Sequence, residues 1–189
     1  EEQEGRDGAS LVQLEMAHAM LESASQEHSL AFWESSARVR LRVGDRAGAG
    51  EASRRAVDLL RENDPVRAAR VLYPVARAAW ESGRLAEAVE LFEQVAALDG
   101  AHEDALNALV ELHVAGSRGR HALATLDRLL PLASSDARAC ALLMRIGEIN
   151  NDLLKDLDAA ESAYRRAINQ SSAEWLPHRR LFFVLIERG

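Results

Sequence analysis

Residues 72–92 read LYPVARAAWESGRLAEAVELF, and this stretch decides the fold. Its apolar residues recur at intervals of three and four, which is the spacing of one face of an α-helix. Gly83 interrupts the pattern, so the stretch predicts two helices joined by a hinge at this glycine. Ala88 is small enough to let the two backbones approach closely. Phe92 and Val95 follow it on the same face and fill the space between the helices.

The composition of the 189-residue chain favours an all-α fold. Apolar residues make up 48% of the sequence, and the residues that dominate it are helix formers: alanine, leucine, glutamate and arginine. No run alternates β-branched or aromatic residues with polar ones in the way that a half-buried strand requires. A chain of this length can form one domain or two small ones.

The formal net charge of −7 disfavours nonspecific nucleic-acid binding. The only cysteine, Cys140, excludes an intrachain disulfide, and its apolar neighbours indicate a buried, inert thiol in a reducing compartment. We find no signal peptide and no membrane-spanning run, so we expect a cytoplasmic protein that does not bind membranes. Lys155 is the lone lysine among many arginines, which is typical of a bacterial protein from a GC-rich genome.

Periodicity and capping signals predict a series of helices after a polar, disordered tail over residues 1–9. The expected helices cover about residues 11–25, 29–43, 48–62, 65–82, 84–98, 101–115, 121–130, 135–149, 157–169 and 175–187. Ser134 or Ser135 is expected to cap the helix that ends at Ile149, and Asn150 to close it. Pro74 lies well inside a predicted helix and removes one hydrogen bond from it. That helix is either kinked at Pro74 or broken just before it, and the sequence leaves both open.

The small residue, large residue and apolar residue at positions 88, 92 and 95 occur again twice in the chain. The three triplets are Ala88, Phe92 and Val95; Ala122, Leu126 and Leu129; and Ala160, Tyr164 and Ala167. The residue numbers of the first two triplets differ by 34 and those of the last two by 38. The longer interval indicates an insertion near residues 153–156. A degenerate earlier copy places Ala49 and Ala56 in the same roles.

A helix-turn-helix unit of about 34 residues with this spacing resembles the tetratricopeptide repeat. The resemblance covers about residues 30–189 and implies a right-handed superhelical solenoid of antiparallel helix pairs, with about four to five repeats. One pair cannot bury its own apolar face, so neighbouring pairs must stack and share a core. The repeats are expected at residues 30–64 (degenerate), 69–102, 103–136 and 137–174, with a half repeat at 175–189. Residues 10–189 are expected to form a single domain.

The chain departs from the family pattern at two places. The glycine or alanine that the family places beside the central leucine is replaced by Val110 and Met144, and the proline at the end of the repeat is absent. These departures affect the expected curvature more than the expected fold.

In the family, first-helix residues that face away from the second helix line a concave peptide-binding groove. The resemblance implies that this groove contains Arg70, Tyr73, Arg77, Trp80, Asn107, Glu111, Arg138, Arg145 and Arg179, with Arg38 and Arg180 in the same register. The many arginines imply a ligand that is an acidic peptide or helix, with Tyr73 or Trp80 as an apolar anchor. The alternative is that these arginines are solvated and pair with local glutamates, which contributes little free energy.

Other patterns predict no catalytic, metal or cofactor site. Family members that clamp a C-terminal carboxylate use an asparagine where this chain has Arg77, Glu111 and Arg145, so we do not predict that activity. No two histidines have the i, i+4 spacing of a helical metal pair, and no glycine-rich loop continues into the lysine and serine of a phosphate site. An acidic cluster near the insertion is expected to be a solvated loop: Glu148, Asp152, Asp156 and Asp158.

The leading hypothesis is a noncatalytic protein-interaction scaffold with no cofactor, whose groove binds a peptide or helix of a partner. A second hypothesis is structural, because one run near the C-terminus has no polar side and favours self-association: Leu181, Phe182, Phe183, Leu185 and Ile186. A third is that the chain is a regulatory or scaffolding part of a larger multidomain protein or enzyme.

Overall fold

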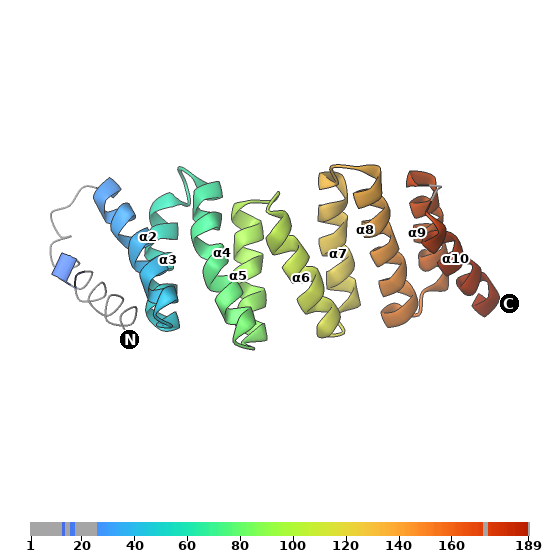
Figure 1. Cartoon of the computed structure of the whole chain (residues 1–189), viewed down its shortest axis with the longest axis horizontal. Coiled ribbons are helices and arrows are strands. Elements are labelled where there is room, and N and C mark those ends of the chain that lie inside the picture. Colours follow the sequence, from blue (N-terminus) through green and yellow to red (C-terminus); the bar gives the residue numbers. More distant parts are fainter. Residues whose placement is uncertain (1–12, 14–15, 18–25, 172–173, 189) are drawn as a thin grey trace. The chain divides into compact units, whose positions relative to one another are not determined.

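The computed structural model describes residues 13, 16–17, 26–171 and 174–188 (Figure 1). These residues form α-helices with one short 3₁₀ turn and one π turn, and they contain no strand. The predicted all-α fold of antiparallel helix pairs is confirmed. The predicted tail over residues 1–9 and most of the predicted helix over 11–25 lie outside the described residues. None of the described helices is long and apolar enough to cross a membrane.

The chain divides into two compact units, Glu1–His102 and Glu103–Gly189. The boundary falls between the repeats predicted at 69–102 and 103–136. That residues 10–189 form a single domain stays a prediction.

The first unit contains two helix pairs. Helix α2 (Gln26–Arg42) packs against α3 (Arg46–Leu60), and α4 (Pro65–Glu81) packs against α5 (Leu85–Leu98). Aspartates begin two of these helices: a side-chain oxygen of Asp45 accepts from the backbone N–H of Gly48 at 2.9 Å, and Asp64 accepts from that of Arg67 at 3.0 Å. Packing of α3 on α4 joins the two pairs.

Helix α4 continues through Pro74 without a break, so the alternative in which it breaks just before the proline is wrong. The residues on either side of the proline explain this. Leu72 before it and Val75 and Ala76 after it are all buried. Packing of both halves on the rest of the unit therefore holds them in one helix despite the missing hydrogen bond.

The second unit contains two pairs and one further helix. Helix α6 (Glu103–Ala115) packs against α7 (Gly119–Leu129), α8 (Asp136–Ile149) packs against α9 (Leu157–Gln170), and α10 (Trp175–Arg188) packs on α9. A 3₁₀ turn over Leu130–Leu132 follows α7 at Pro131. Of the two candidate serines, Ser135 caps α8, because its hydroxyl oxygen accepts from the N–H of Arg138 at 3.2 Å.

Helix α8 ends at Ile149 with Asn150 as its C-cap, as predicted. The chain then continues directly into a π turn over Asn150–Leu154. The buried side chain of Asn150 donates to the carbonyl oxygen of Ile146 at 2.9 Å, which satisfies one of the last carbonyl groups of α8. This turn contains the extra residues that make this repeat longer than the others.

The second helix of each repeat buries the same three positions. In α5, α7 and α9 these seam residues are at most 1% exposed: Ala88, Phe92 and Val95; Ala122, Leu126 and Leu129; Ala160, Tyr164 and Ala167. In α3 the equivalent Ala49 and Ala56 are fully buried, and Ser53 takes the place of the large middle residue. The equivalence of the repeats is thereby confirmed.

One residue in the left-handed backbone region joins the two helices of each pair. Gly44 and Gly83 have φ of 81° and 75°, whereas Ser117 and Lys155 have φ of 55° and 57°. This region costs a non-glycine residue roughly 1–2 kcal/mol, because its Cβ approaches the following carbonyl oxygen. Gly44 and Gly83 avoid this cost. Ser117 does not, although it occupies the place of Gly83 in the next repeat.

The largest seam residue, Tyr164, fits because the residue opposite it has no side chain. A Cβ atom on Gly147 of α8 would lie 2.7 Å from Cζ of Tyr164 and closer still to its Cε1. Two buried residues precede Gly147 in the same register, Ala79 and His113, and their repeats carry other seam residues. Position 147 therefore requires glycine because the Tyr164 ring leaves no room for a side chain, and not because the backbone conformation there demands it.

We predict that Gly147→Ala destabilises the protein by about 1–3 kcal/mol, because the added methyl group overpacks the Tyr164 ring. Chemical denaturation followed by circular dichroism measures the loss. The matched control is Gly50→Ala in α3, where a Cβ meets nothing within 4 Å. That change should stabilise the protein by roughly 0.5–1 kcal/mol, as expected for alanine in a helix. A gain from both substitutions would contradict the proposed packing.

We predict that Ser117→Gly raises the free energy of unfolding by up to about 1 kcal/mol, because glycine adopts the left-handed region without steric cost. The same denaturation assay measures it. Ser162→Gly, at an exposed position inside α9, should instead lower stability. Equal effects of the two glycines would show that the left-handed backbone of Ser117 carries no cost.

Burial raises the pKa of Tyr164 to about 12 from its ordinary value of 10.0, and nearby Glu148 and Asp152 add to the shift while Arg180 opposes it. The folded protein therefore favours the neutral phenol, and the unfolded chain ionises it first. We predict that this stabilisation is complete below pH 10 and is lost as the pH rises to about 12. Denaturation midpoints across this range should fall more steeply for the wild type than for Tyr164→Phe, and parallel curves would exclude this role for the phenol.

Candidate functional site

The first helices of the first unit, α2 and α4, line a groove. It consists of two adjoining hollows of ≈ 580 and ≈ 540 Å³ that share Leu41 and Pro74. Three predicted groove residues line these hollows, Arg70, Tyr73 and Arg77, and so does Arg38. We call this surface the α2–α4 groove and define it by these six residues: Arg38, Leu41, Arg70, Tyr73, Pro74 and Arg77.

Two of the four arginines that line the hollows are paired with the two glutamates that line them. Nε and Nη2 of Arg67 donate to the two carboxylate oxygens of Glu34 at 2.7 and 2.8 Å, which ties α4 to α2. Arg77 donates to Glu81 at 2.7 Å, and this hydrogen bond is the main cause of the raised pKa of Arg77.

The other two arginines of the groove are not compensated in this way. Arg38 on α2 and Arg70 on α4 are exposed and form no ion pair with any residue in the described part of the chain. The groove therefore carries two positive charges that no lining carboxylate balances, although the whole chain is acidic.

The two predicted aromatic anchors lie differently. The half-buried Tyr73 stacks on His102 with ring centroids 4.8 Å apart and also lines the groove. Trp80 is 37% exposed and rests edge-on against Phe92 at 6.0 Å, but it lines neither hollow. Tyr73 is thus the aromatic residue that a molecule in the groove would contact.

Pro74 changes the backbone hydrogen bonding of α4 beside the groove. It has no N–H, so the carbonyl oxygen of Arg70, four residues earlier, receives no i+4 hydrogen bond within α4. Arg70 and Pro74 line the same hollow.

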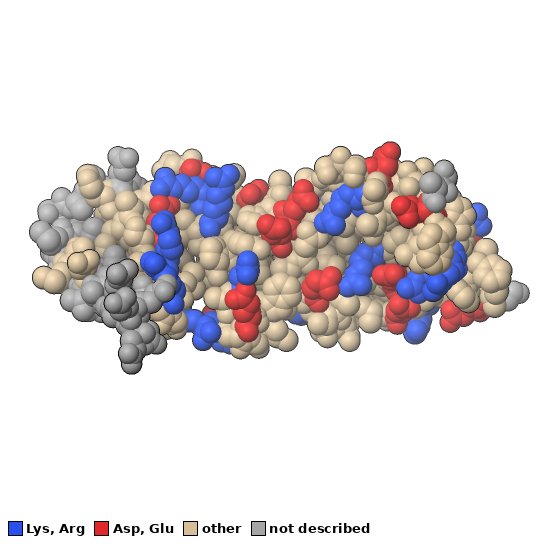
Figure 2. All heavy atoms as spheres, in the orientation of Figure 1, with Lys and Arg blue, Asp and Glu red and all other residues tan. Residues whose placement is uncertain are grey.

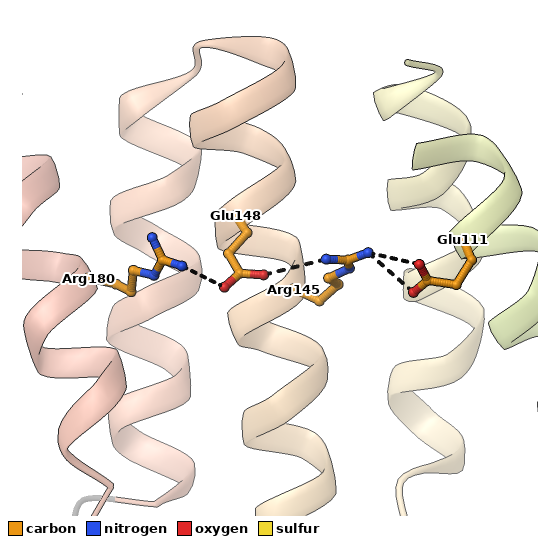
Figure 3. A network of polar contacts seen from close by, with 4 residues as sticks. All are labelled: Glu111, Arg145, Glu148 and Arg180. Atoms are coloured by element: carbon orange, nitrogen blue, oxygen red, sulfur yellow. Dashed lines mark hydrogen bonds and ion pairs between the residues drawn. The ribbon is translucent and has the colours of Figure 1, made fainter. Parts of the chain in front are cut away.

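The predicted groove residues of the second unit form a ladder of alternating charge, which Figure 3 shows. Nη2 of Arg145 donates to both carboxylate oxygens of Glu111 at 3.2 Å, and its Nη1 lies 3.7 Å from Glu148. Arg180 donates to the other oxygen of Glu148 at 3.2 Å. This ladder links α6, α8 and α10, the first helices of three successive repeats, and its four charges cancel.

A further hydrogen bond accompanies the ladder. Arg138 of α8 donates to the side-chain oxygen of Asn107 of α6 at 3.0 Å. Arg179 of α10 lies outside the ladder, with its guanidinium 5.3 Å from the ring of Trp175 and 6.0 Å from that of Phe183. In the second unit, pairing with local partners is therefore the arrangement of the predicted groove arginines.

The expected solvated acidic loop is wrong for Glu148 and Asp158, which lie on α8 and α9, and Asp158 forms an ion pair with Arg188 at 2.9 Å. Glu148 lies on α8, one turn after Arg145, and bridges two arginines. Asp156 caps α9 by accepting from the N–H of Ala159 at 2.9 Å. Within the described residues no three histidine, cysteine, aspartate or glutamate side chains are grouped to hold a metal ion.

Cys140 is buried, as predicted. Burial is the main cause of the raised pKa of its thiol, and the nearby Glu174 carboxylate adds to it. Both effects disfavour the reactive thiolate.

Sequence analysis missed the interhelical pairs, although the sequence carried a signal for them. Each pair joins residues about one repeat apart on successive first helices: Glu34 with Arg67, Asn107 with Arg138, Glu111 with Arg145, and Glu148 with Arg180. A search for opposite charges at this separation would have found three of the four. Figure 2 agrees with this pattern, because basic and acidic side chains are interspersed within each unit on the face in view.

Three comparisons relate the chain to known proteins. A family model described as tetratricopeptide repeat matches residues 79–146. No curated protein matches the sequence at a significant level. Solved structures with a similar fold include a crystal structure of the MamA protein, with a TM-score of 0.58 and 16% identity over 86% of this chain and 84% of that chain.

Two further structures are similar in fold. MamA from Desulfovibrio magneticus RS-1, from residue 41 to its end, has a TM-score of 0.53 and 23% identity, with 85% of each chain covered. BtubC from P. vanneervenii has a TM-score of 0.52 and 18% identity over 96% of this chain and 82% of that chain. The family match, the repeated seam and these shared folds support the resemblance: the chain is a helical repeat protein whose residues 79–146 match the tetratricopeptide repeat.

Proposed function

We propose that the chain is a noncatalytic protein-interaction scaffold whose α2–α4 groove binds an acidic segment of a partner protein. The observation that carries the proposal is the pair of exposed arginines, Arg38 and Arg70, which line one hollow from two helices and have no carboxylate partner among the described residues. The tetratricopeptide fold supports a scaffold, because repeats of this kind present extended surfaces to partners.

Charge supports an acidic ligand. The planar guanidinium group donates to both oxygens of a carboxylate, and such charge-assisted hydrogen bonds are stronger than neutral ones. A ligand carboxylate that reaches Arg38 or Arg70 displaces water and breaks no existing ion pair. At Arg145, in contrast, it would have to displace Glu111, and the net gain from exchanging one exposed pair for another is small.

The groove also favours a ligand with apolar side chains. Leu41 and Pro74 lie where the two hollows meet, and Tyr73 lines one side. Apolar contacts of this kind supply affinity, while the arginines at their edge set charge preference.

The chemistry of the groove supports binding and not catalysis. The residues that line its hollows include no histidine, cysteine, serine or lysine. Its carboxylates, Glu34 and Glu81, are both hydrogen-bonded to arginines.

We predict that the double substitution Arg38→Glu and Arg70→Glu weakens binding of an acidic probe by roughly tenfold or more for each arginine, the loss expected for charge-assisted hydrogen bonds. The probe is a short fluorescein-labelled peptide of alternating glutamate and leucine, and fluorescence anisotropy measures its affinity. Binding by the wild type should weaken as ionic strength rises.

The matched control is Arg166→Glu, which reverses one exposed arginine of α9 that has no ion pair with a described residue. It should leave the affinity within about twofold of the wild type, since it lies in the other unit. A probe with glutamine in place of glutamate should bind weakly to every variant. The groove is excluded if the double substitution and Arg166→Glu have the same effect while circular dichroism shows that all variants are folded.

A further inference from the structure

Helix α10 exposes a broad apolar side. Phe182, Phe183 and Ile186 are 59%, 55% and 61% exposed, and Trp175 and Leu185 are also exposed. The buried residues of the helix are Pro177 and Val184. The predicted self-association run thus lies at the surface, apart from Leu181, which is half-buried.

Comparison with the other first helices shows which face of α10 is left uncovered by the described residues. Leu181, Phe182 and Leu185 occupy the places that Leu143, Met144 and Gly147 have in α8. In α4, α6 and α8 the residues at these three positions are buried: Val75, Ala76 and Ala79; Leu109, Val110 and His113; Leu143, Met144 and Gly147. A second helix packs against each of those first helices, whereas in α10 the same face meets no second helix among the described residues.

The second helices that cover the equivalent faces of the other first helices show what kind of helix would fit α10. In α5, α7 and α9 the second helix approaches its first helix with a small residue, then a large apolar or aromatic residue four positions later and an apolar residue three positions after that. Two copies of α10 do not supply this pattern to each other, because their facing residues are all large. The seams of α3, α5, α7 and α9 are already buried within their own pairs.

The stretch before α2 carries the pattern in the register of the repeats. The residue numbers of Ser10, Leu14 and Ala17 are lower by 39 than those of the α3 seam at Ala49, Ser53 and Ala56. The same difference separates the α3 seam from the α5 seam, so the sequence places residues 10–25 in the register of a second helix. Of Ser10, Leu14 and Ala17, the structure describes Ala17, which is exposed.

The charges of the two segments favour the contact at one arginine. In α10, Arg180 and Arg188 are paired with carboxylates of α8 and α9, whereas Arg179 forms no ion pair with a described residue. Residues 10–25 contain two glutamates, Glu15 and Glu22, and no lysine or arginine. We propose that the apolar side of α10 binds residues 10–25 of a second copy of the chain. In the proposed arrangement each copy uses its two different surfaces on two different neighbours, so the contact repeats from copy to copy and generates rings or open chains of subunits.

The test measures the mass of the purified protein by light scattering over a wide concentration range. The expected mass rises with concentration beyond that of a dimer. A synthetic peptide of residues 9–25 in excess should bind and reduce the mass to that of the monomer, and the same peptide with Leu14→Glu should bind at least tenfold more weakly.

The double substitution Phe182→Glu and Leu185→Glu should abolish both assembly and peptide binding. Its matched control is Leu85→Glu, which changes an exposed apolar residue at the start of α5 and should leave both unchanged. Circular dichroism confirms that the variants are folded. A monomer at every concentration, a dimer of fixed mass, assembly that survives the two α10 substitutions, or assembly that the peptide does not disrupt would each overturn the proposal.

Discussion

The structure depends on one packing constraint: a single pair of these helices has more apolar surface than it can bury on its own. The two helices of a pair bury part of this surface by packing closely at Ala88, Ala122 and Ala160. A larger side chain at any of these buried positions would push the two backbones apart. Each second helix is consequently buried on a fixed face. The remaining face of each first helix is left for solvent, for the next repeat, or for a ligand.

The first helices use this free face differently in the two units. In the second unit, Glu111, Arg145, Glu148 and Arg180 satisfy one another from repeat to repeat, so the ladder they form is electrically neutral. The other two predicted groove arginines of this unit contact neutral groups: Arg138 bonds to Asn107, and Arg179 lies against two aromatic rings. In the first unit, Arg38 and Arg70 form no ion pair with a described residue, and they line a hollow together with the apolar residues Leu41 and Pro74. Selective recognition needs unsatisfied groups, and these two arginines are such groups.

The sequence predicts the helices and the repeat well, because periodicity, caps and small seam residues are local or regular features. Gly44, Gly83 and the triplet at Ala88 are examples. Sequence analysis failed where packing decides. Buried residues on both sides of Pro74 keep α4 in one piece, and the inserted residues after Ile149 form a π turn instead of a loop. The candidate site was predicted as one continuous set of arginines, because composition does not show which of them meet a glutamate one repeat away.

The most direct test of the account is an NMR titration of the isotopically labelled protein with an unlabelled acidic peptide, observed through the backbone amide and arginine side-chain signals. The account predicts that the shifts concentrate in α2 and α4, with the largest changes at Arg38, Arg70 and Tyr73, and that the ladder arginines of α8 and α10 respond little. Shifts that concentrate in α6, α8 and α10, or the absence of any saturable shift, would contradict it.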